Sequence, residues 1–327
     1  MKAIIIPQFG EASVLTQKEV ITPQPGLGEV TIDVAYAGIN YAEVLFRKGV
    51  VADLSLPFVP GIEVSGTIRE IGEGVTGFQI GQAVAALTIV GGGGYAEVVK
   101  VDADLVIALD QETKTIDMEV AAAFPSNVTT AMMILSDVAH MEKGETVLVH
   151  AAAGGVGSAI GQMARALGAA RVIGVVGSKQ KIAYAKSLGY NEVYLRDEYV
   201  EAIRGSGIDI VIDQVGGDAR ETGLSLLSPL GRLVVMGNAS EAEDVAVSAN
   251  ELWFSSKAVL GFNLQLMSVY HPKAVAKAAK KALPYVVSGQ VSVDVTDVVN
   301  LEDIAKAHKS IEDRTSKGKM VLQVKTT

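Results

Sequence analysis

The chain has no cysteine among its 327 residues, only four histidines and few aromatic side chains. The missing cysteines exclude disulfide bonds, thiolate zinc sites, iron–sulfur clusters and cysteine nucleophiles. No two histidines stand at the spacing of zinc ligands, so we expect no metal site. Proline is also scarce, with 9 residues against 34 glycines, which favours a fold with many tight turns between strands and helices.

Positively charged residues are fewer than negatively charged residues. The chain has 28 lysine and arginine residues against 37 aspartate and glutamate residues, a net charge of −9. An acidic chain without a basic cluster is repelled by phosphate backbones, which excludes nucleic acid as the main partner. The longest uncharged stretch, residues 74–96, is too rich in glycine for a membrane helix, and the first residues lack the apolar region of a signal peptide. We expect a cytoplasmic protein with no membrane partner.

Two patterns divide the chain. Before residue 118, short stretches such as Val30–Tyr36, Glu63–Gly72 and Tyr95–Val101 are separated by glycine and proline, which is typical of an antiparallel, barrel-like or sandwich unit. From residue 118, apolar runs alternate with helical segments, which predicts a doubly wound parallel sheet. The predicted fold class is therefore α/β with a second, β-rich domain. We place the β-rich domain at residues 1–117 and 263–327, and the nucleotide-binding domain at residues 118–262.

The expected elements of the second pattern are specific enough to be tested. The six expected strands are Thr146–His150, Arg171–Val176, Val193–Leu195, Ile208–Ile212, Gly231–Met236 and Ala258–Phe262. The helices expected between them include Val156–Leu167, Gln180–Leu188 and Asp218–Leu227. After residue 262 we expect a helix at Pro272–Val287, a strand at Val291–Val295, a helix at Leu301–Glu312 and a strand at Met320–Val324.

The sharpest motif is a glycine-rich turn between an apolar strand and a helix. Ala152, Gly154 and Gly157 occupy the three positions of the G-x-G-x-x-G signature, with alanine in place of the first glycine. Gly155 and Val156 lie where the helix opens, and the N–H groups of this helix N-terminus suit a pyrophosphate. The alternative is a glycine-rich turn of an unrelated α/β fold, which the flanking strand and helix disfavour.

The end of the next expected strand predicts the choice of cofactor. NAD-binding folds carry a carboxylate there for the ribose hydroxyls, and residues 176–181 contain none. Ser178, Lys179 and Lys181 instead offer a hydroxyl and two cations to a 2′-phosphate, and Arg196 joins them from the following strand. The alternative for the two lysines is a solvated first helical turn. We expect NADPH rather than NADH.

Further motifs extend along the whole chain. They are Ala151-Ala-Ala-Gly-Gly-Val-Gly-x4-Gln, Leu167-Gly-Ala, Leu188-Gly, Gly38-Ile-Asn-Tyr-Ala-Glu, Pro60-Gly-Ile-Glu-Val-Ser-Gly, Gly93-Gly-Tyr-Ala-Glu, Leu227-Ser-Pro-Leu-Gly-Arg and Gly318-Lys-Met-Val-Leu. Together they resemble the zinc-free quinone oxidoreductase branch of the medium-chain dehydrogenase/reductase superfamily. The resemblance implies a GroES-like, partly open catalytic barrel built from both chain ends and a cleft between the domains. It also implies a homodimer joined through the last strand of the nucleotide-binding sheet.

The resemblance also concerns metal. Zinc-dependent relatives carry a cysteine ligand at the position of Asn40 and a histidine ligand at the position of Ile62. Composition and resemblance therefore agree in predicting no zinc. Without a Lewis acid, oxidation of an alcohol is disfavoured and reduction of an already activated acceptor is favoured.

The resemblance further implies the residues of the site. Asn40 lies at the nicotinamide end, Glu43 follows one turn later and Tyr95 is a candidate to line the pocket, so these three are the expected catalytic residues. The alternatives are a first-turn helix carboxylate for Glu43 and a core residue for Tyr95. Leu45 and Val51 replace tyrosines of the relatives, which predicts a more aliphatic pocket.

The remaining implied residues contact the cofactor. Thr130 faces the nicotinamide, and Ser178, Lys181 and Arg314 contact the phosphate on the adenosine side. Asn238 and Asn263 follow the ends of expected strands, where ligand groups gather, although either can equally cap a turn.

Three functions fit these observations. The leading one is an NADPH-dependent reductase of quinones or other conjugated carbonyl compounds, in which the protein supplies orientation and exclusion of water. The second is an enone, enal or enoyl-thioester double-bond reductase with the same cofactor. The third is a non-enzymatic NADPH-binding protein of the crystallin kind. No strong general acid is apparent in the sequence.

Overall fold

The computed structural model describes residues 1–50, 54–109 and 116–325. By their contacts they form two compact units. Unit 1 comprises Met1–Thr129, Gln265–Val287 and Val293–Thr327, and unit 2 comprises Thr130–Leu264 and Ser288–Ser292. The expected domain limits at residues 118 and 262 stay a prediction about functional domains.

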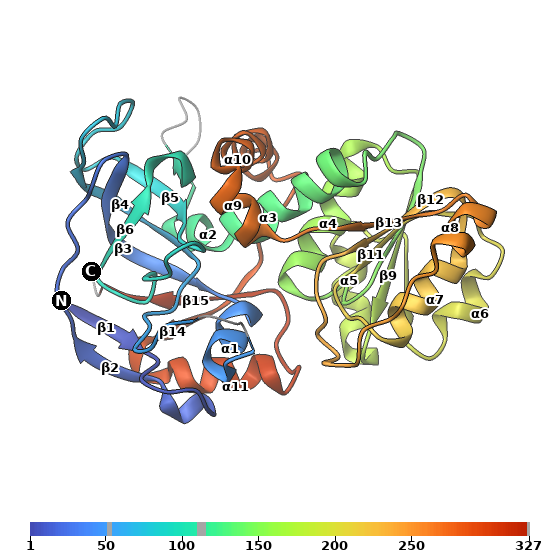
Figure 1. Ribbon diagram of the computed structural model, residues 1–327, viewed down its shortest axis with the longest axis horizontal. Helices are drawn as coiled ribbons and strands as arrows, with labels where there is room; N and C mark the ends of the chain where they lie inside the picture. The colour runs from blue at the N-terminus through green and yellow to red at the C-terminus, as the bar shows by residue number, and fades with distance from the viewer. Residues whose placement is uncertain (51–53, 110–115, 326–327) are drawn as a thin grey trace. The chain divides into compact units, whose positions relative to one another are not determined.

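Unit 1 is built on a seven-stranded sheet in the order β14-β15-β3-β4-β5-β7, with β6 also paired to β3 (Figure 1). The strand pairs are antiparallel except β14 with β15. The strands are β3 (Glu29–Ile39), β4 (Glu63–Ile71), β5 (Ala83–Leu87), β6 (Val98–Asp102), β7 (Val106–Ala108), β14 (Val295–Asn300) and β15 (Lys319–Gln323), with a separate pair β1 (Lys2–Ile5) and β2 (Thr16–Glu19). The helices are α1 (Tyr41–Lys48), α2 (Met118–Ala123), α3 (Pro125–Met132), α9 (Leu264–Tyr270), α10 (Pro272–Val287) and α11 (Ile304–Glu312).

Strand β3 positions the candidate site of unit 1. Its alternating residues Val30, Ile32 and Val34 are fully buried, as a strand with one face on a core requires. It pairs with β4, with Ala37 opposite Val64, and with β15, with Ile39 opposite Met320. The end of β3 therefore lies beside the first residues of both β4 and β15, although these residues are far apart in the sequence.

Unit 2 is a doubly wound parallel sheet in the order β10-β9-β8-β11-β12-β13. The strands are β8 (Thr146–Val149), β9 (Arg171–Val176), β10 (Glu192–Leu195), β11 (Ile208–Asp213), β12 (Leu227–Val235) and β13 (Ala258–Gly261). The helices are α4 (Gly155–Leu167), α5 (Ile182–Ser187), α6 (Tyr199–Ile203), α7 (Asp218–Leu226) and α8 (Ala249–Ser255), and a π-helix spans Met133–Val138. Because parallel strands need crossover helices on both faces, the apolar runs of β8, β9 and β11 are buried throughout.

The predicted fold class is confirmed, and all six expected strands of the nucleotide-binding part are present, Arg171–Val176 with the expected ends and the other five with shifted ends. One expected strand, Val291–Val295, is wrong: β14 begins only at Val295 and runs to Asn300. The physical reason lies at Ser292. Its N–H donates to Gln162 Oε1 over 2.9 Å and its carbonyl accepts from Gln162 Nε2 over 3.0 Å, so neither group is free to pair with a strand.

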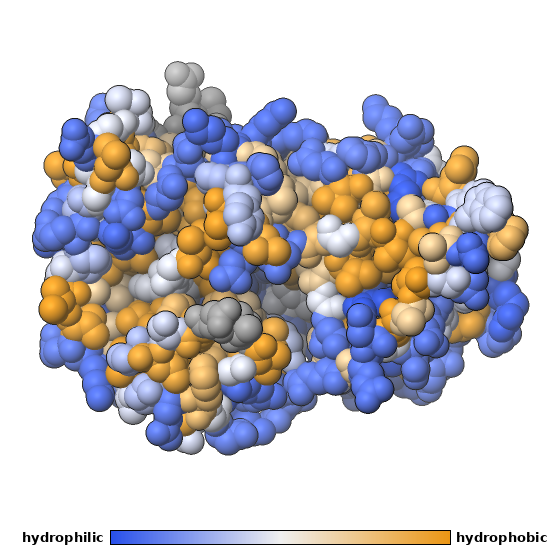
Figure 2. Space-filling model, in the orientation of Figure 1, coloured by the Kyte–Doolittle hydropathy of each residue, from blue (hydrophilic) through white to orange (hydrophobic). Residues whose placement is uncertain are grey.

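The surface is mixed in character. Figure 2 shows one face of the molecule, on which hydrophobic residues form several separate areas with hydrophilic residues between them. No helix in the described part of the chain combines the length and the apolar character needed to cross a membrane.

Candidate active site and nucleotide-binding turn

The glycine-rich turn has the geometry that a pyrophosphate site requires. Strand β8 ends at Val149, the N–H of Ala152 donates to the carbonyl of Val175 on β9 over 3.0 Å, and α4 begins at Gly155 with Gly154 as its N-cap. A Cβ on Gly157 would lie 2.4 Å from the carbonyl oxygen of Ala151, so only glycine allows the helix to approach the turn this closely. The first N–H groups of α4, including those of Gly155 and Val156, are left for a bound anion.

A tyrosine that sequence reasoning missed supports this turn. The ring of Tyr190 fills the space beside Gly161 and Gly174, where a Cβ on either glycine would come within 2.4–3.0 Å of it. Its hydroxyl donates to the carbonyl oxygen of Gly157 over 2.5 Å. The sequence signal for a bulky neighbour is a pair of glycines that do not lie in turns: Gly161 lies inside a helix and Gly174 inside a strand.

The expected phosphate residues follow the end of β9. Ser178 is the N-cap of a short 3-10 helix, Lys179–Lys181, and Arg196 donates its backbone N–H to Val176 over 3.1 Å. The exposed guanidinium of Arg196 lies beside Gly177, with Nη2 3.6 Å from the place of a Cβ on that glycine. The structure therefore brings Arg196 to the strand end that carries Ser178. Their role toward a phosphate stays a prediction.

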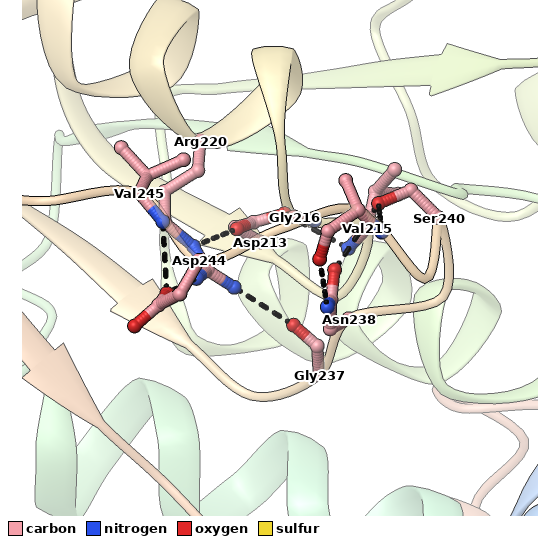
Figure 3. A network of polar contacts seen from close by, with 10 residues as sticks. Asp213, Val215, Gly216, Arg220, Gly237, Asn238, Ser240, Asp244 and Val245 are labelled. Carbon is pink, nitrogen blue, oxygen red and sulfur yellow. Dashed lines mark hydrogen bonds and ion pairs between the residues drawn. The ribbon is translucent and has the colours of Figure 1, made fainter.

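A buried ion pair holds the loop that contains Asn238 (Figure 3). Arg220 Nε donates to Asp213 Oδ2 over 2.9 Å, its Nη2 donates to the carbonyl of Gly237 over 2.9 Å, and its Nη1 contacts Asp244 over 3.0 Å. The side chain of Asn238 donates to the carbonyl of Ala242 over 2.8 Å, so it closes the turn after β12. Turn capping, the alternative for Asn238, is thus present, and its contact with the cofactor stays a prediction.

The other expected cofactor residues are spread over both units. Thr130 is buried in α3 and is the first residue of unit 2, and Asn263 is exposed between β13 and α9. Arg314 lies in unit 1, two residues after the end of α11, with a positive φ of 57°. The contacts of these three with a cofactor remain predictions.

The expected catalytic residues Asn40 and Glu43 form the start of α1. Asn40 is the N-cap, and its backbone N–H donates to Glu43 Oε2 over 2.8 Å. The other carboxyl oxygen of Glu43 accepts the N–H of Ile62 over 3.0 Å. Burial raises the pKa of Glu43 from 4.5 to about 7, with the nearby Lys319 ammonium acting in the opposite direction. Unit 1 thus holds a group that titrates near neutral pH, which sequence reasoning missed.

Two further charged residues join this pair, and neither was expected as a site residue. Lys319, the first residue of β15, donates to both Asn40 Oδ1 and Glu63 Oε1. Asn40 Nδ2 also donates to Glu63 Oε1 over 3.0 Å. Both lie inside motifs that carry the resemblance, but only strand pairing reveals that they meet.

Tyr95, the third expected catalytic residue, is fully buried in unit 1. Its ring packs edge-on against His308, with 6.1 Å between the ring centroids. Among the described residues, no hydrogen-bond partner reaches its hydroxyl. Burial, followed by the charges of Glu43 and Glu63, raises its pKa well above 10.0. The surroundings of Tyr95 are those of a core residue, which was the alternative for this position. Its catalytic role stays a prediction.

The pocket residues give a divided result. Leu45 is half-buried on α1, whereas Val51 lies outside the described residues.

Within the part of the chain that the structure describes, no three His, Asp or Glu side chains gather in a way that could hold a metal ion.

Two known family models of dehydrogenases match the chain, the first within unit 1 and the second mainly within unit 2. Residues 26–111 match the alcohol dehydrogenase GroES-like domain, and residues 155–281 match the zinc-binding dehydrogenase model. This arrangement defines a medium-chain dehydrogenase/reductase.

Whole-chain relatives narrow the class. Rat quinone oxidoreductase is 31% identical over 335 residues, which cover 98% of this chain and 97% of the relative. The human synaptic vesicle membrane protein VAT-1 homolog-like is 29% identical over 100% of this chain and 82% of the relative. The crystal structure of Escherichia coli quinone oxidoreductase complexed with NADPH has a TM-score of 0.88 and 29% identity, and covers 99% of this chain and 100% of that chain. The chain belongs to the quinone oxidoreductase branch of the medium-chain dehydrogenase/reductase superfamily.

Proposed function

We propose that the protein is an NADPH-dependent, zinc-independent reductase of quinones or related conjugated carbonyl compounds. One observation carries the proposal: Arg196 lies beside Gly177 at the end of β9, next to Ser178. Residues 176–181, which start at this strand end, contain no carboxylate. A strand end with a hydroxyl, an arginine and nearby lysines suits a 2′-phosphate rather than bare ribose hydroxyls.

The residues of unit 2 fit the cofactor. The N–H groups at the start of α4 would hold the pyrophosphate, because Gly157 lets the helix begin close to the turn. Ser178, Lys181 and Arg196 would hold the 2′-phosphate. NADPH bound there supplies hydride, which the side chains of this protein cannot supply.

The chemistry of unit 1 supports independence from zinc. The positions at which zinc-dependent relatives carry ligands hold an amide, Asn40, and an aliphatic side chain, Ile62. The Lys319 ammonium already lies against Asn40 Oδ1, so a cation occupies the place where a metal would need that oxygen. A divalent ion there would be repelled by the ammonium.

The half-buried Asn40 amide is the polar group that we assign to orient the acceptor, and Glu43 is assigned to hold a proton. The carboxyl group of Glu43 accepts the N–H groups of Asn40 and Ile62, and burial raises its pKa to about 7, which suits a group that holds a proton near neutral pH. A reduced quinone also takes protons readily from water, so we assign Glu43 no obligatory transfer.

A second candidate, reduction of an enone, enal or enoyl thioester, uses the same cofactor site. A thioester with a phosphopantetheine arm needs free cations near the acceptor. Arg47 is instead fully buried and pairs with Glu312 over 2.6 Å, and Lys48 lies 3.5 Å from the same carboxylate. This favours small acceptors over phosphorylated carriers. In the third candidate, a non-enzymatic protein, NADPH would bind without turnover.

Assembly and location complete the proposal. We propose a cytoplasmic homodimer in which two copies meet at β13, the last strand of the unit 2 sheet. Large apolar side chains near this edge are exposed: Leu230 is 81%, Trp253 73% and Phe254 79% accessible. Exposed apolar surface of this kind is typical of an interface.

The decisive experiment measures oxidation of NADPH and of NADH by the purified protein over a panel of quinones, enals and enones, with and without a chelator. We expect turnover with NADPH and quinones that the chelator leaves unchanged. Tight binding of NADPH with no turnover on any acceptor would favour the non-enzymatic candidate. Activity that requires stoichiometric zinc would reject the proposal.

A further inference from the structure

The charged side chains behind Asn40 are buried, whereas Asn40 itself is half-buried. Glu43 and Glu63 are fully buried and Lys319 is 4% exposed, while Asn40 is half-buried. Of these four side chains, Asn40 is thus the one within reach of a small molecule. Any influence of the buried charges on a bound acceptor has to pass through its amide.

The partners of Asn40 select one orientation of that amide. An ammonium only donates hydrogen bonds and a carboxylate only accepts them. Lys319 Nζ therefore faces Oδ1, and Glu63 Oε1 faces Nδ2 over 3.0 Å. A flipped amide would bring NH₂ against the ammonium and oxygen against the carboxylate, two repulsive contacts. The second hydrogen of Nδ2 has only long contacts, 3.4 Å to Gly38 O and to Glu43 Oε1.

The anchor of this arrangement is itself rigid. Glu63 Oε2 accepts the backbone N–H of Ser126, near the start of α3, over 2.8 Å. Its side chain lies directly over Gly38, where a Cβ would come within 2.4 Å of Oε1. Glycine at position 38 is thus the condition for placing the carboxylate beside Asn40. With both oxygens engaged, Glu63 holds the Lys319 ammonium in a place where an unpaired cation would be very costly.

We propose that Lys319, held by Glu63, is a positioning residue that locks the Asn40 amide in one orientation and so determines which edge of it an acceptor meets. This inference rests on the proposed reductase function. Lys319 acts through Asn40 and need not touch the acceptor.

The test separates positioning from mere stability by comparing variants of the full-length protein. Lys319→Met should lower kcat for quinone reduction by about 100-fold, the cost of a misplaced contact group, with little change in NADPH affinity. Because this variant leaves Glu63 unpaired and could fail to fold, the double variant Lys319→Met/Glu63→Gln is measured beside it. Because the N–H of Ser126 keeps the oxygen of the amide introduced by Glu63→Gln, its NH₂ group faces Asn40 and favours the flipped orientation. In the double variant kcat should therefore stay low although the unpaired charge is gone.

Two comparisons complete the kinetic test. In the Asn40→Ala variant, adding Lys319→Met should cause no further loss of kcat, because the amide that Lys319 orients is already absent. Lys325→Met, which removes an exposed partner of Asp33 at 2.9 Å in the same unit, is the matched control and should leave kcat unchanged. Full recovery in the double variant, or an equal additional loss in the Asn40→Ala background, would overturn the inference.

A readout without turnover keeps the inference apart from the proposed function. The side-chain NH₂ signals of Asn40 are assigned by their loss in Asn40→Ala. In the ¹⁵N-labelled protein the hydrogen bonded to Glu63 should exchange slowly with water, and in the double variant it should exchange quickly. If the wild-type protein reduces no acceptor but these signals behave as expected, the reductase proposal fails and the positioning role stands. Equal exchange in both proteins would reject the positioning role.

Discussion

Glu43 provides a quantitative test of the electrostatics of unit 1. Its carboxyl group has a pKa of about 7 in the folded protein against 4.5 for an ordinary glutamate, chiefly because it is buried. Below pH 4.5 both the folded and the unfolded states carry the proton, and the folded state bears no penalty. Between pH 4.5 and pH 7 the unfolded state has lost its proton while the folded state still carries one. The free energy of unfolding therefore falls as the pH rises through this range. A shift of this size corresponds to roughly 3 kcal/mol, fully lost above pH 7.

The perturbation is Glu43→Gln, which removes the titration. The amide puts an NH₂ group against the N–H of either Asn40 or Ile62, which costs about 1–3 kcal/mol at every pH. The informative quantity is therefore the slope. The stability advantage of the wild-type protein over Glu43→Gln should shrink by roughly 3 kcal/mol between pH 4.5 and pH 8. Glu73→Gln, an exposed carboxylate of unit 1, should show no such trend.

The assay has to follow unit 1. The single tryptophan, Trp253, lies in unit 2, so its fluorescence reports the wrong part of the chain. Urea unfolding followed by circular dichroism, together with hydrogen exchange of peptides that contain Asn40 and Ile62, is appropriate. A wild-type advantage that is constant with pH would mean an unshifted pKa for Glu43, and one that grows with pH would mean a lowered pKa; either result would refute the reasoning from burial.

Three other predictions concern the cofactor site and the assembly. Lys181→Ala should weaken NADPH by about one to two orders of magnitude in a fluorescence titration and leave NADH unchanged, and equal losses would reject the 2′-phosphate assignment. Gly157→Ala should abolish NADPH binding and lower Tm, because its Cβ meets a backbone oxygen at 2.4 Å, whereas Gly91→Ala, with open space around it, should do neither. Trp253→Ser/Phe254→Ser should convert the proposed dimer into a monomer by light scattering, and a monomeric wild-type protein would contradict the dimer.

Local sequence determined much of the nucleotide-binding unit. Arg171–Val176 was expected as a strand and is one, because a continuous apolar run between turn residues can only be a buried parallel strand or a short buried helix segment. The glycine turn was equally readable, since Gly157 meets its steric limit within six residues of the chain, at Ala151. Signals of this kind involve neighbours in sequence, so they need no knowledge of the fold.

Tertiary structure alone decided the rest. Lys319 meets Glu63 across 256 residues because β15 and β4 both pair with β3, and a pairing register cannot be deduced from either strand by itself. The same holds for Ser292, whose backbone is taken by the side chain of Gln162, 130 residues away, so that the strand starts at Val295. The raised pKa of Glu43 is also a tertiary property, because a carboxylate at the start of a helix titrates normally until a fold removes it from water.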